Sequence, residues 1–248
     1  VSLAASFAAG ALAGLVTGFL HTKLRIPGIL AGILTMIALY SINIRIMGQA
    51  NTPLLGEPTM LDITTQLGLS KTIGSLLIGI VFSAVIVALM YWFFGTELGS
   101  AIRATGNNER MVRALGVDTN NMKNIALMLS NALVALSGAM VAQSQGYADV
   151  GMGTGTIVIG LASIIIGEVV FGKRFSFWYR LMSVVFGSVI YRIIIAVVLQ
   201  LGMKSTDLKL LTAVIVAVAL ALPVVRGDIT KRGNRLRNRA ALSKGGQR

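Results

Sequence analysis

The chain has 248 residues, of which 55% are hydrophobic and only 12% are charged. It contains no cysteine and a single histidine, His21, which excludes structural disulfides and makes a zinc or histidine-based centre hard to assemble. A net charge of +13 would suggest nucleic acid as the partner of a soluble protein, but the apolar content indicates a membrane protein instead.

Apolar stretches close to the length of a membrane-spanning helix recur along the whole chain. Such a helix needs about 20 apolar residues, or roughly 30 Å of helix. The sequence predicts seven spans, at residues 1–20, 27–47, 72–94, 122–142, 156–171, 181–200 and 208–225. The predicted fold class is therefore all-α, a polytopic transmembrane helix bundle over residues 1–225, followed by a basic tail at residues 226–248.

The cations indicate which ends of the spans face the cytoplasm. Seventeen of the 22 Lys and Arg residues lie in alternate connections and in the tail, and five lie elsewhere. Basic connections stay on the cytoplasmic side, so the C-terminus is expected there, where the tail also touches anionic lipid. This parity puts residue 1 outside, so we expect an odd number of spans, one in the simplest case, to be missing before it.

Glycines in the first two spans repeat at intervals of four. They are Gly10, Gly14 and Gly18 in the first span, and Gly28 and Gly32 in the second. Small residues at this spacing let helix backbones approach closely inside a membrane. The spacing favours packing within one subunit, and the alternative is a seam between two identical subunits.

Two connections on the predicted outer side are candidates for functional elements. Residues 48–71 form a polar connection, which is either a plain solvated loop or part of the face that receives a solute-delivery protein. Residues 143–155 hold four glycines directly after a span. They form either a broken or re-entrant element beside a pathway, because irregular backbone is tolerated at membrane depth only when it is buried or wet, or a simple extracellular turn.

The polar segment at residues 97–123 is predicted to be cytoplasmic and helical. Gly106 is expected to end a helix that descends from Trp92, and Asn108 to cap a helix of about two turns. Gly116 ends this short helix, and Asp118 caps the next span. An apolar face is predicted from four residues, Met111, Val112, Ala114 and Leu115. A helix this short is unstable alone, so it is held by a partner's groove or merely connects two spans at the membrane surface.

Polar residues within spans are costly there and are hence candidates for a solute pathway or for inter-helix bonds. They are Asn131, Gln143, Gln145, Glu168 and Arg192, and the last two are expected to form an ion pair. Residues 167–174 fit a phosphate-binding glycine loop only superficially, since Arg174 replaces the hydroxyl residue and the run closes an apolar span. ATP binding by this chain is therefore not expected.

The sequence GSAIRATGNNERMVRALGVDTNNMKNIALMLSNALVALSGAMVAQSQGYADVGMGTGTIVIGLASIIIGE resembles the permease subunits of bacterial ATP-binding-cassette importers. The branch is the one related to branched-chain amino-acid and ribose permeases. The run GILAGILTMIALYSINIRIMG is similar to the aromatic-amino-acid-type and uncharacterised permeases of that branch. The resemblance implies an amino acid or a similar small polar solute as substrate.

In that family a loop of the form A-x-R-A-x-G-x-N-x-x-x-A-x-x-x-G contacts a cytoplasmic ATPase. The resemblance assigns this role to a coupling segment at residues 95–121, with contacts from Arg103, Ala104, Gly106, Asn108, Arg110, Met111, Ala114, Leu115 and Gly116. It also implies two ATPase subunits that carry ATP and magnesium, an external solute-binding protein, a second and identical permease subunit, and a place in the bacterial cytoplasmic membrane. The chain itself is then no enzyme and holds no cofactor or metal.

Two other classes of function are weaker. A stand-alone secondary transporter or channel needs its own coupling-ion site, for which Glu168 and Asp149 are available, but no inverted repeat with paired broken helices is evident. An intramembrane enzyme lacks a base and a nucleophile at suitable spacing.

Overall fold

The computed structural model describes residues 2–54, 56, 59–60, 70–153, 156–171 and 177–201, with residues 210, 213–214, 217 and 221. The predicted basic tail and most of the predicted span at residues 208–225 lie outside the described residues. The chain divides into two compact units, Val1–Gly153 and Thr154–Arg248. Each unit is described by itself.

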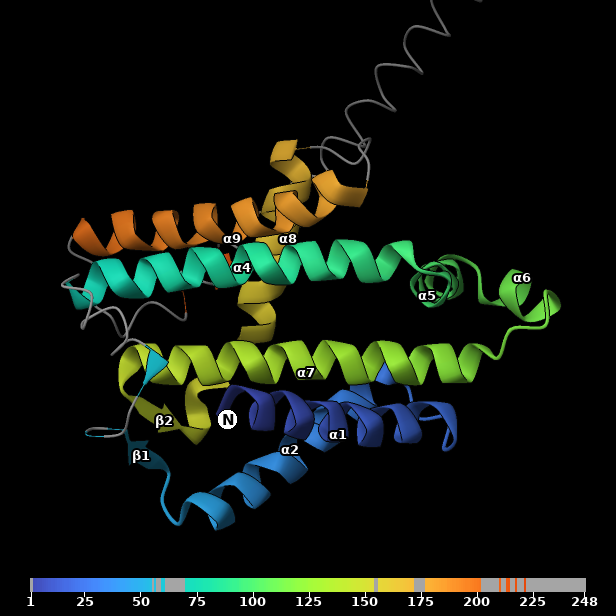
Figure 1. Cartoon of the computed structure of the whole chain (residues 1–248), viewed down its shortest axis with the longest axis horizontal. Helices are drawn as coiled ribbons and strands as arrows, with labels where there is room; N and C mark the ends of the chain where they lie inside the picture. The colour runs from blue at the N-terminus through green and yellow to red at the C-terminus, as the bar shows by residue number, and fades with distance from the viewer. Residues whose placement is uncertain are drawn as a thin grey trace, which may run out of the picture. The chain divides into compact units, whose positions relative to one another are not determined.

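The first unit contains most of the helices and a small sheet (Figure 1). Its elements in chain order are α1 (Ser2–Thr22), α2 (Gly28–Met47), β1 (Asn51–Pro53), α4 (Lys71–Gly95), α5 (Glu97–Asn107), α6 (Glu109–Ala114), α7 (Thr119–Gln145), β2 (Tyr147–Asp149) and the short 3₁₀ helix η1 (Val150–Gly153). β1 and β2 lie at one end of the unit, whereas α5 and α6 lie at the other (Figure 1).

The second unit contains α8 (Thr156–Phe171) and α9 (Phe177–Gln200). Among the described helices, α1, α2, α4, α7 and α9 are long and apolar enough to cross a membrane, and α8 is a shorter apolar helix. The first six predicted spans are therefore confirmed as helices, with bounds that differ by a few residues. The chain is a polytopic, predominantly helical membrane protein, and the part that the structure describes also holds a two-stranded sheet.

A seam of small residues joins α1 to α7, which are antiparallel. Gly10, Gly14 and Gly18 are buried on α1. A Cβ added to Gly10 would lie 2.9 Å from Cα of Ala132, and one added to Gly14 would lie 2.7 Å from Cα of Met128. The two backbones thus touch where side chains would otherwise separate them. The predicted packing within one subunit is confirmed for these three glycines, whereas nothing lies within 4 Å of a Cβ added to Gly32.

Hydroxyl groups add polar contacts between α1 and its two neighbours, α2 and α7. Thr17 is 5% exposed, and its hydroxyl donates to Oγ1 of Thr35 on α2 at 2.9 Å. The Thr22 hydroxyl donates to Oδ1 of Asn124 on α7 at 3.1 Å. Because the end of α1 meets the start of α7, the connection that carries Lys23 and Arg25 lies at the same end of the unit as α5 and α6. This agrees with the predicted grouping of basic connections on one side.

A second seam of the same type joins α8 to α9. A Cβ on Gly187 would lie 2.8 Å from N of Gly167, and one on Gly167 would lie 2.8 Å from C of Ser183. Phe171 and Phe186 also meet, with ring centroids 5.6 Å apart. The register places Ser183 opposite Gly167, and Arg192 lies nine positions, or roughly 14 Å of helix, beyond Ser183. This offset does not favour the predicted ion pair between Glu168 and Arg192, which stays a prediction.

The glycine-rich stretch after α7 forms a corner that leads into the small sheet. Gly146 ends α7 in the left-handed conformation, at φ 77°. The chain then enters β2, which pairs antiparallel with β1, so that Thr52 lies opposite Ala148. The described part of residues 143–155 forms the end of α7, β2 and η1, and the choice between a re-entrant element and an extracellular turn stays a prediction. The pairing also attaches the polar connection after α2 to the end of α7.

Candidate functional site

The candidate site is the polar segment at the end of the first unit that carries α5 and α6. It begins at a corner between α4 and α5, where Thr96 ends one helix and caps the other. The Thr96 hydroxyl accepts from N of Gly99 at 3.2 Å, and a Cβ on Gly99 would lie 2.5 Å from Cα of Phe94. The prediction of one helix from Trp92 to Gly106 is therefore wrong. The helix is interrupted at Thr96, and the second helix, α5, continues past Gly106 to Asn107.

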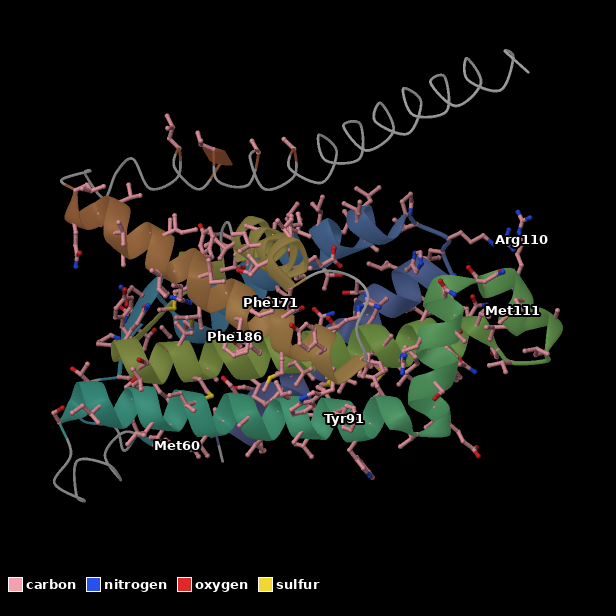
Figure 2. All side chains as sticks on the ribbon, turned by 90° about the horizontal axis from the view of Figure 1, so that it is seen from above. Met60, Tyr91, Arg110, Met111, Phe171 and Phe186 are labelled. Atoms are coloured by element: carbon pink, nitrogen blue, oxygen red, sulfur yellow. The ribbon has the colours of Figure 1, made fainter. Side chains whose placement is uncertain are left out.

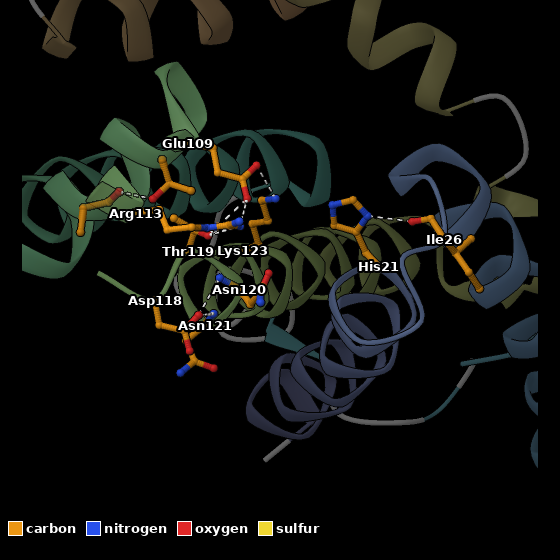
Figure 3. Close-up of polar contacts among 11 residues, drawn as sticks. His21, Ile26, Glu109, Arg113, Asp118, Thr119, Asn120, Asn121 and Lys123 are labelled. Carbon is orange, nitrogen blue, oxygen red and sulfur yellow. Dashed lines mark hydrogen bonds and ion pairs between the residues drawn. The ribbon is translucent and has the colours of Figure 1, made fainter. Parts of the chain in front are cut away.

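The helix that follows is set by the residues that the sequence indicated. Oδ1 of Asn108 accepts from N of Met111 at 3.2 Å and caps α6. Gly116 adopts a φ of 86° directly after this helix. Oδ1 of Asp118 accepts from N of Asn120 at 2.9 Å and caps α7 (Figure 3). The predicted cap at Asn108, the stop at Gly116 and the cap at Asp118 are confirmed.

The apolar side chains of α6 point in two directions. Val112 is 3% exposed and packs within the chain, whereas Met111 is 50% and Leu115 73% exposed. Figure 2 shows Arg110 and Met111 at the end of the unit formed by α6. The prediction of a single apolar face is corrected: one side chain anchors α6 to its own unit, and two remain available to a partner.

A cluster of polar side chains links α6 to the start of α7 (Figure 3). The Glu109 carboxylate lies 2.7 Å from Nζ of Lys123 and 2.8 Å from Nη2 of Arg113. It also accepts a hydrogen bond of 3.2 Å from the Thr119 hydroxyl. Thr119, which is 1% exposed, in turn accepts from Nη2 of Arg113 at 3.1 Å. One carboxylate therefore has three donors, one on α6 and two on α7.

The electrostatics of Glu109 follow from these contacts. The hydrogen bond from Lys123 lowers the pKa of the carboxyl below its ordinary value, and the charge of Lys123, the Thr119 hydroxyl and Arg113 act in the same direction. Desolvation opposes them. The carboxylate is thus charged at neutral pH, and its bonds to both helices are retained there.

The outer surface of α6 carries a shallow hollow of ≈ 460 Å³. It is lined by Glu109, Arg110, Arg113 and Ala114. Arg110 is exposed, Met111 lies on the same helix, and Leu115 directly follows it. The segment thus combines apolar and cationic groups, which suits a partner surface with an apolar depression and carboxylates nearby.

The predicted ATPase-contacting residues all fall on α5, on α6 or on their flanking turns. Arg103, Ala104 and Gly106 lie on α5. Arg110, Met111 and Ala114 lie on α6, which Asn108 precedes and Leu115 and Gly116 follow. The structure therefore brings the predicted set into one stretch of two short helices, and its contact with an ATPase stays a prediction.

The residues predicted for a solute pathway are divided between the two units. Nδ2 of Asn131 donates to O of Leu127 on the same helix, at 2.9 Å. The Gln143 side chain accepts from N of Met60 at 3.2 Å and donates to Oγ of Ser2 at 3.4 Å. Gln145 is exposed at the end of α7, and Glu168 and Arg192 belong to the second unit. A pathway role for these five stays a prediction.

Sequence reasoning missed the cluster around Glu109. The spacing of Glu109 and Arg113 is that of a stabilising pair within a helix, and this was a signal in the sequence. Lys123 and Thr119 lie on the next helix, and their approach depends on the turn after α6. The sequence Gly95-Thr96-Glu97 was a further signal, since Thr before an acidic residue is typical of a helix start.

Comparison with known proteins identifies a family. Residues 1–221 match the family described as branched-chain amino acid transport system / permease component. The chain is 41% identical over 212 residues to a tyrosine transport system permease protein of Clostridioides difficile, which covers 86% of this chain and 69% of the relative. No solved structure matches it.

Two further relatives are more distant. An uncharacterised protein of Rickettsia prowazekii is 32% identical over 224 residues, which covers 89% of this chain and 78% of that protein. A ribose import permease protein of Escherichia coli K12 is 29% identical over 137 residues, which covers 54% of this chain and 41% of that protein.

Proposed function

The chain belongs to the family of permease components of branched-chain amino acid transport systems, and we propose that α6 is the element through which it is driven by an ATPase. As a family member it is the membrane-spanning, non-catalytic permease component of an ATP-binding-cassette transport system. ATP and magnesium are then bound by separate cytoplasmic ATPase subunits. The observation that supports the role of α6 is the exposure of Met111 and Leu115 on a capped helix outside the spans.

The physical reason for a partner at α6 is its size. Six residues do not form a stable helix in water alone, and the caps stabilise it only partly. Val112 holds one side of the helix, while Met111 and Leu115 leave apolar surface uncovered. Burial of such side chains stabilises a contact by about 1.5–3 kcal/mol each. A groove on the ATPase that accepts both residues would therefore complete the packing of α6.

The proposed solute is an amino acid, with an aromatic amino acid as the first candidate. The support is the relative named as a tyrosine transport permease, at 41% identity. The direction is import, as in the relative named as a ribose import permease. An external solute-binding protein delivers the solute to the end that carries β1 and β2, and a second, identical permease completes the transport unit.

The proposed orientation follows the charges. The end with α5, α6 and Lys123 faces the cytoplasm of a bacterium, and the end with β1 and β2 faces outward. The C-terminus is then cytoplasmic as well. Nucleotide-driven closure of the ATPase subunits would displace α6. This displacement shifts the permease between its inward-open and outward-open conformations if the nucleotide binds these two conformations with different affinity.

The experiment is to replace Met111 and Leu115 together by Asp. The exchange puts carboxylates into the proposed apolar contact and leaves every span unchanged. We expect membrane insertion to persist, while co-purification of the ATPase and solute-stimulated ATP hydrolysis both fall about tenfold or more, because a few apolar anchors provide most of the binding energy of an interface. Asn238→Asp, in the basic tail and outside the coupling segment, serves as the polar control. Wild-type ATPase association of the double variant would refute the assignment.

A further inference from the structure

We infer that Glu109 is a positioning residue that fixes α6 to the start of α7, so that the ATPase-facing helix and the longest described helix of the bundle move as one body. This inference rests on the proposed function, because it needs α6 to be the docking element. It goes further in identifying which helix receives the movement and which side chain transmits it.

The first step of the argument is the geometry around the carboxylate. Glu109 is the first residue of α6, and Lys123 lies on α7, one turn after its start. Their charged atoms are 2.7 Å apart. The Thr119 hydroxyl adds a second bond from α7, at 3.2 Å. Two bonds from different turns of α7 to one carboxylate fix both the position and the rotation of α6 relative to α7.

The second step is the shielding of these groups. Only 29% of the Lys123 side chain and 36% of the Glu109 side chain are exposed, and Thr119 is 1% exposed. Partly shielded pairs are screened by salt less than open surface pairs. Arg113, with 63% exposure, stiffens the arrangement from within α6. The cluster is thus more constrained than an isolated surface ion pair.

The third step is the path beyond α7. Gly10, Gly14 and Gly18 bring the α1 backbone into contact with that of α7 along the middle of α1. A seam without intervening side chains has little freedom to slide gradually, because a displaced glycine would meet a larger neighbour. A displacement of α6 would therefore reach α7 through Glu109, and then α1 through the seam. By contrast, α4 is linked to the segment through the break at Thr96.

The experiment uses the full complex of the permease, its ATPase and its solute-binding protein in lipid vesicles. We expect Glu109→Gln to retain ATPase co-purification within about twofold, while solute transported per ATP hydrolysed falls about fivefold or more, the size of a typical coupling between sites. A purely structural role would reduce yield, association and transport together. Asn238→Asp is again the control, since it changes charge outside the coupling segment and leaves the Glu109 cluster intact.

A second variant keeps the inference testable if Glu109→Gln assembles poorly. The cysteine-free chain allows Glu109→Cys and Lys123→Cys to be combined and linked with a short bis-methanethiosulfonate reagent. We expect the unlinked variant to be uncoupled and the linked one to recover transport per ATP, because the tether replaces the ionic contact. The reagent should have no effect on Glu109→Cys alone, and reduction should reverse the recovery.

The outcomes separate the two proposals. Transport blocked by the tether would show that α6 must move relative to α7, and this would overturn the inference. Wild-type coupling in Glu109→Gln would also overturn it. Loss of ATPase association in Glu109→Gln would make Glu109 a docking residue, which contradicts the inference and supports the proposed function. Failure of the proposed function itself is detected separately, by ATPase association that survives the Met111 and Leu115 exchange.

Discussion

The α1–α7 seam and the α5–α6 segment belong to the same unit, but they differ in how far their hydrogen bonds and apolar contacts are completed within the chain. In the seam, three glycines bring backbone against backbone, and Thr17 and Thr22 find acceptors within the unit. In the segment, every cap is satisfied locally, yet Met111 and Leu115 remain exposed. The segment therefore satisfies its hydrogen bonds by itself but leaves apolar side chains exposed. Such a region is expected to bury these side chains against another protein.

The difference also concerns the forces that act in each region. Within a membrane there is no water to drive apolar helices together, so close van der Waals packing of small residues takes that role. Outside the membrane, burial of apolar side chains and charge pairs contribute to stability in the usual way. The seam should therefore be most sensitive to added volume, and the segment to altered polarity and charge.

Gly14→Ala tests the seam and should have the largest effect. The added Cβ would lie 2.7 Å from Cα of Met128, which neither helix can accommodate without moving apart. Overpacking of this kind destabilises by about 1–3 kcal/mol, so the thermal unfolding midpoint in detergent should fall clearly. Gly138→Ala on α7 is the matched control, because nothing lies within 4 Å of its Cβ. Equal midpoints for the two variants would contradict the seam.

Asn108→Ala tests whether local capping holds the segment, with a smaller effect. Loss of the bond from Oδ1 to N of Met111 should destabilise α6 by about 1 kcal/mol. Hydrogen exchange of the α6 amides should then accelerate about fivefold, as that free energy corresponds to such a factor. Asn108→Asp keeps an acceptor at the cap and should exchange at the wild-type rate. An unchanged exchange rate in the Ala variant would mean that Val112 and the Glu109 cluster stabilise α6 without the cap.

The same two regions show what the sequence alone could predict. Spans, the Asn108 and Asp118 caps and the Gly116 stop depend on neighbouring residues, and they were predicted where the structure has them. The glycine spacing predicted a close helix contact, but it did not name α7 as the partner. Partner choice depends on the whole bundle, since several helices in this chain carry small residues.

The sequence predicted which segment forms the candidate site, but not how its side chains contact one another. Its contact residues follow from the family resemblance, whereas the contact of Glu109 with Lys123 depends on the turn between α6 and α7. The break at Thr96 was missed because residues 97–107 continue the helix-forming character of α4. The β1–β2 pairing joins residues nearly a hundred positions apart, and three-residue strands have no sequence period to detect.

A comparison of wild type with Glu109→Gln across pH tests the charge cluster and should give the smallest effect. The folded protein lowers the pKa of this carboxyl, with the Lys123 hydrogen bond as the largest cause. A carboxyl with a depressed pKa stabilises the fold above its unfolded pKa, and this stabilisation is lost as the pH falls through the folded pKa. Wild type should therefore unfold at a higher temperature than the Gln variant at neutral pH, and the gap should close in the acidic range below the ordinary carboxyl pKa.

Lys123→Met should reduce this pH dependence more than Arg113→Gln, because Lys123 contributes most. A gap between wild type and Glu109→Gln that stays constant from neutral to acidic pH would show that Glu109 does not bind α7 through its charge, and the segment would then be held by its caps and Val112 alone.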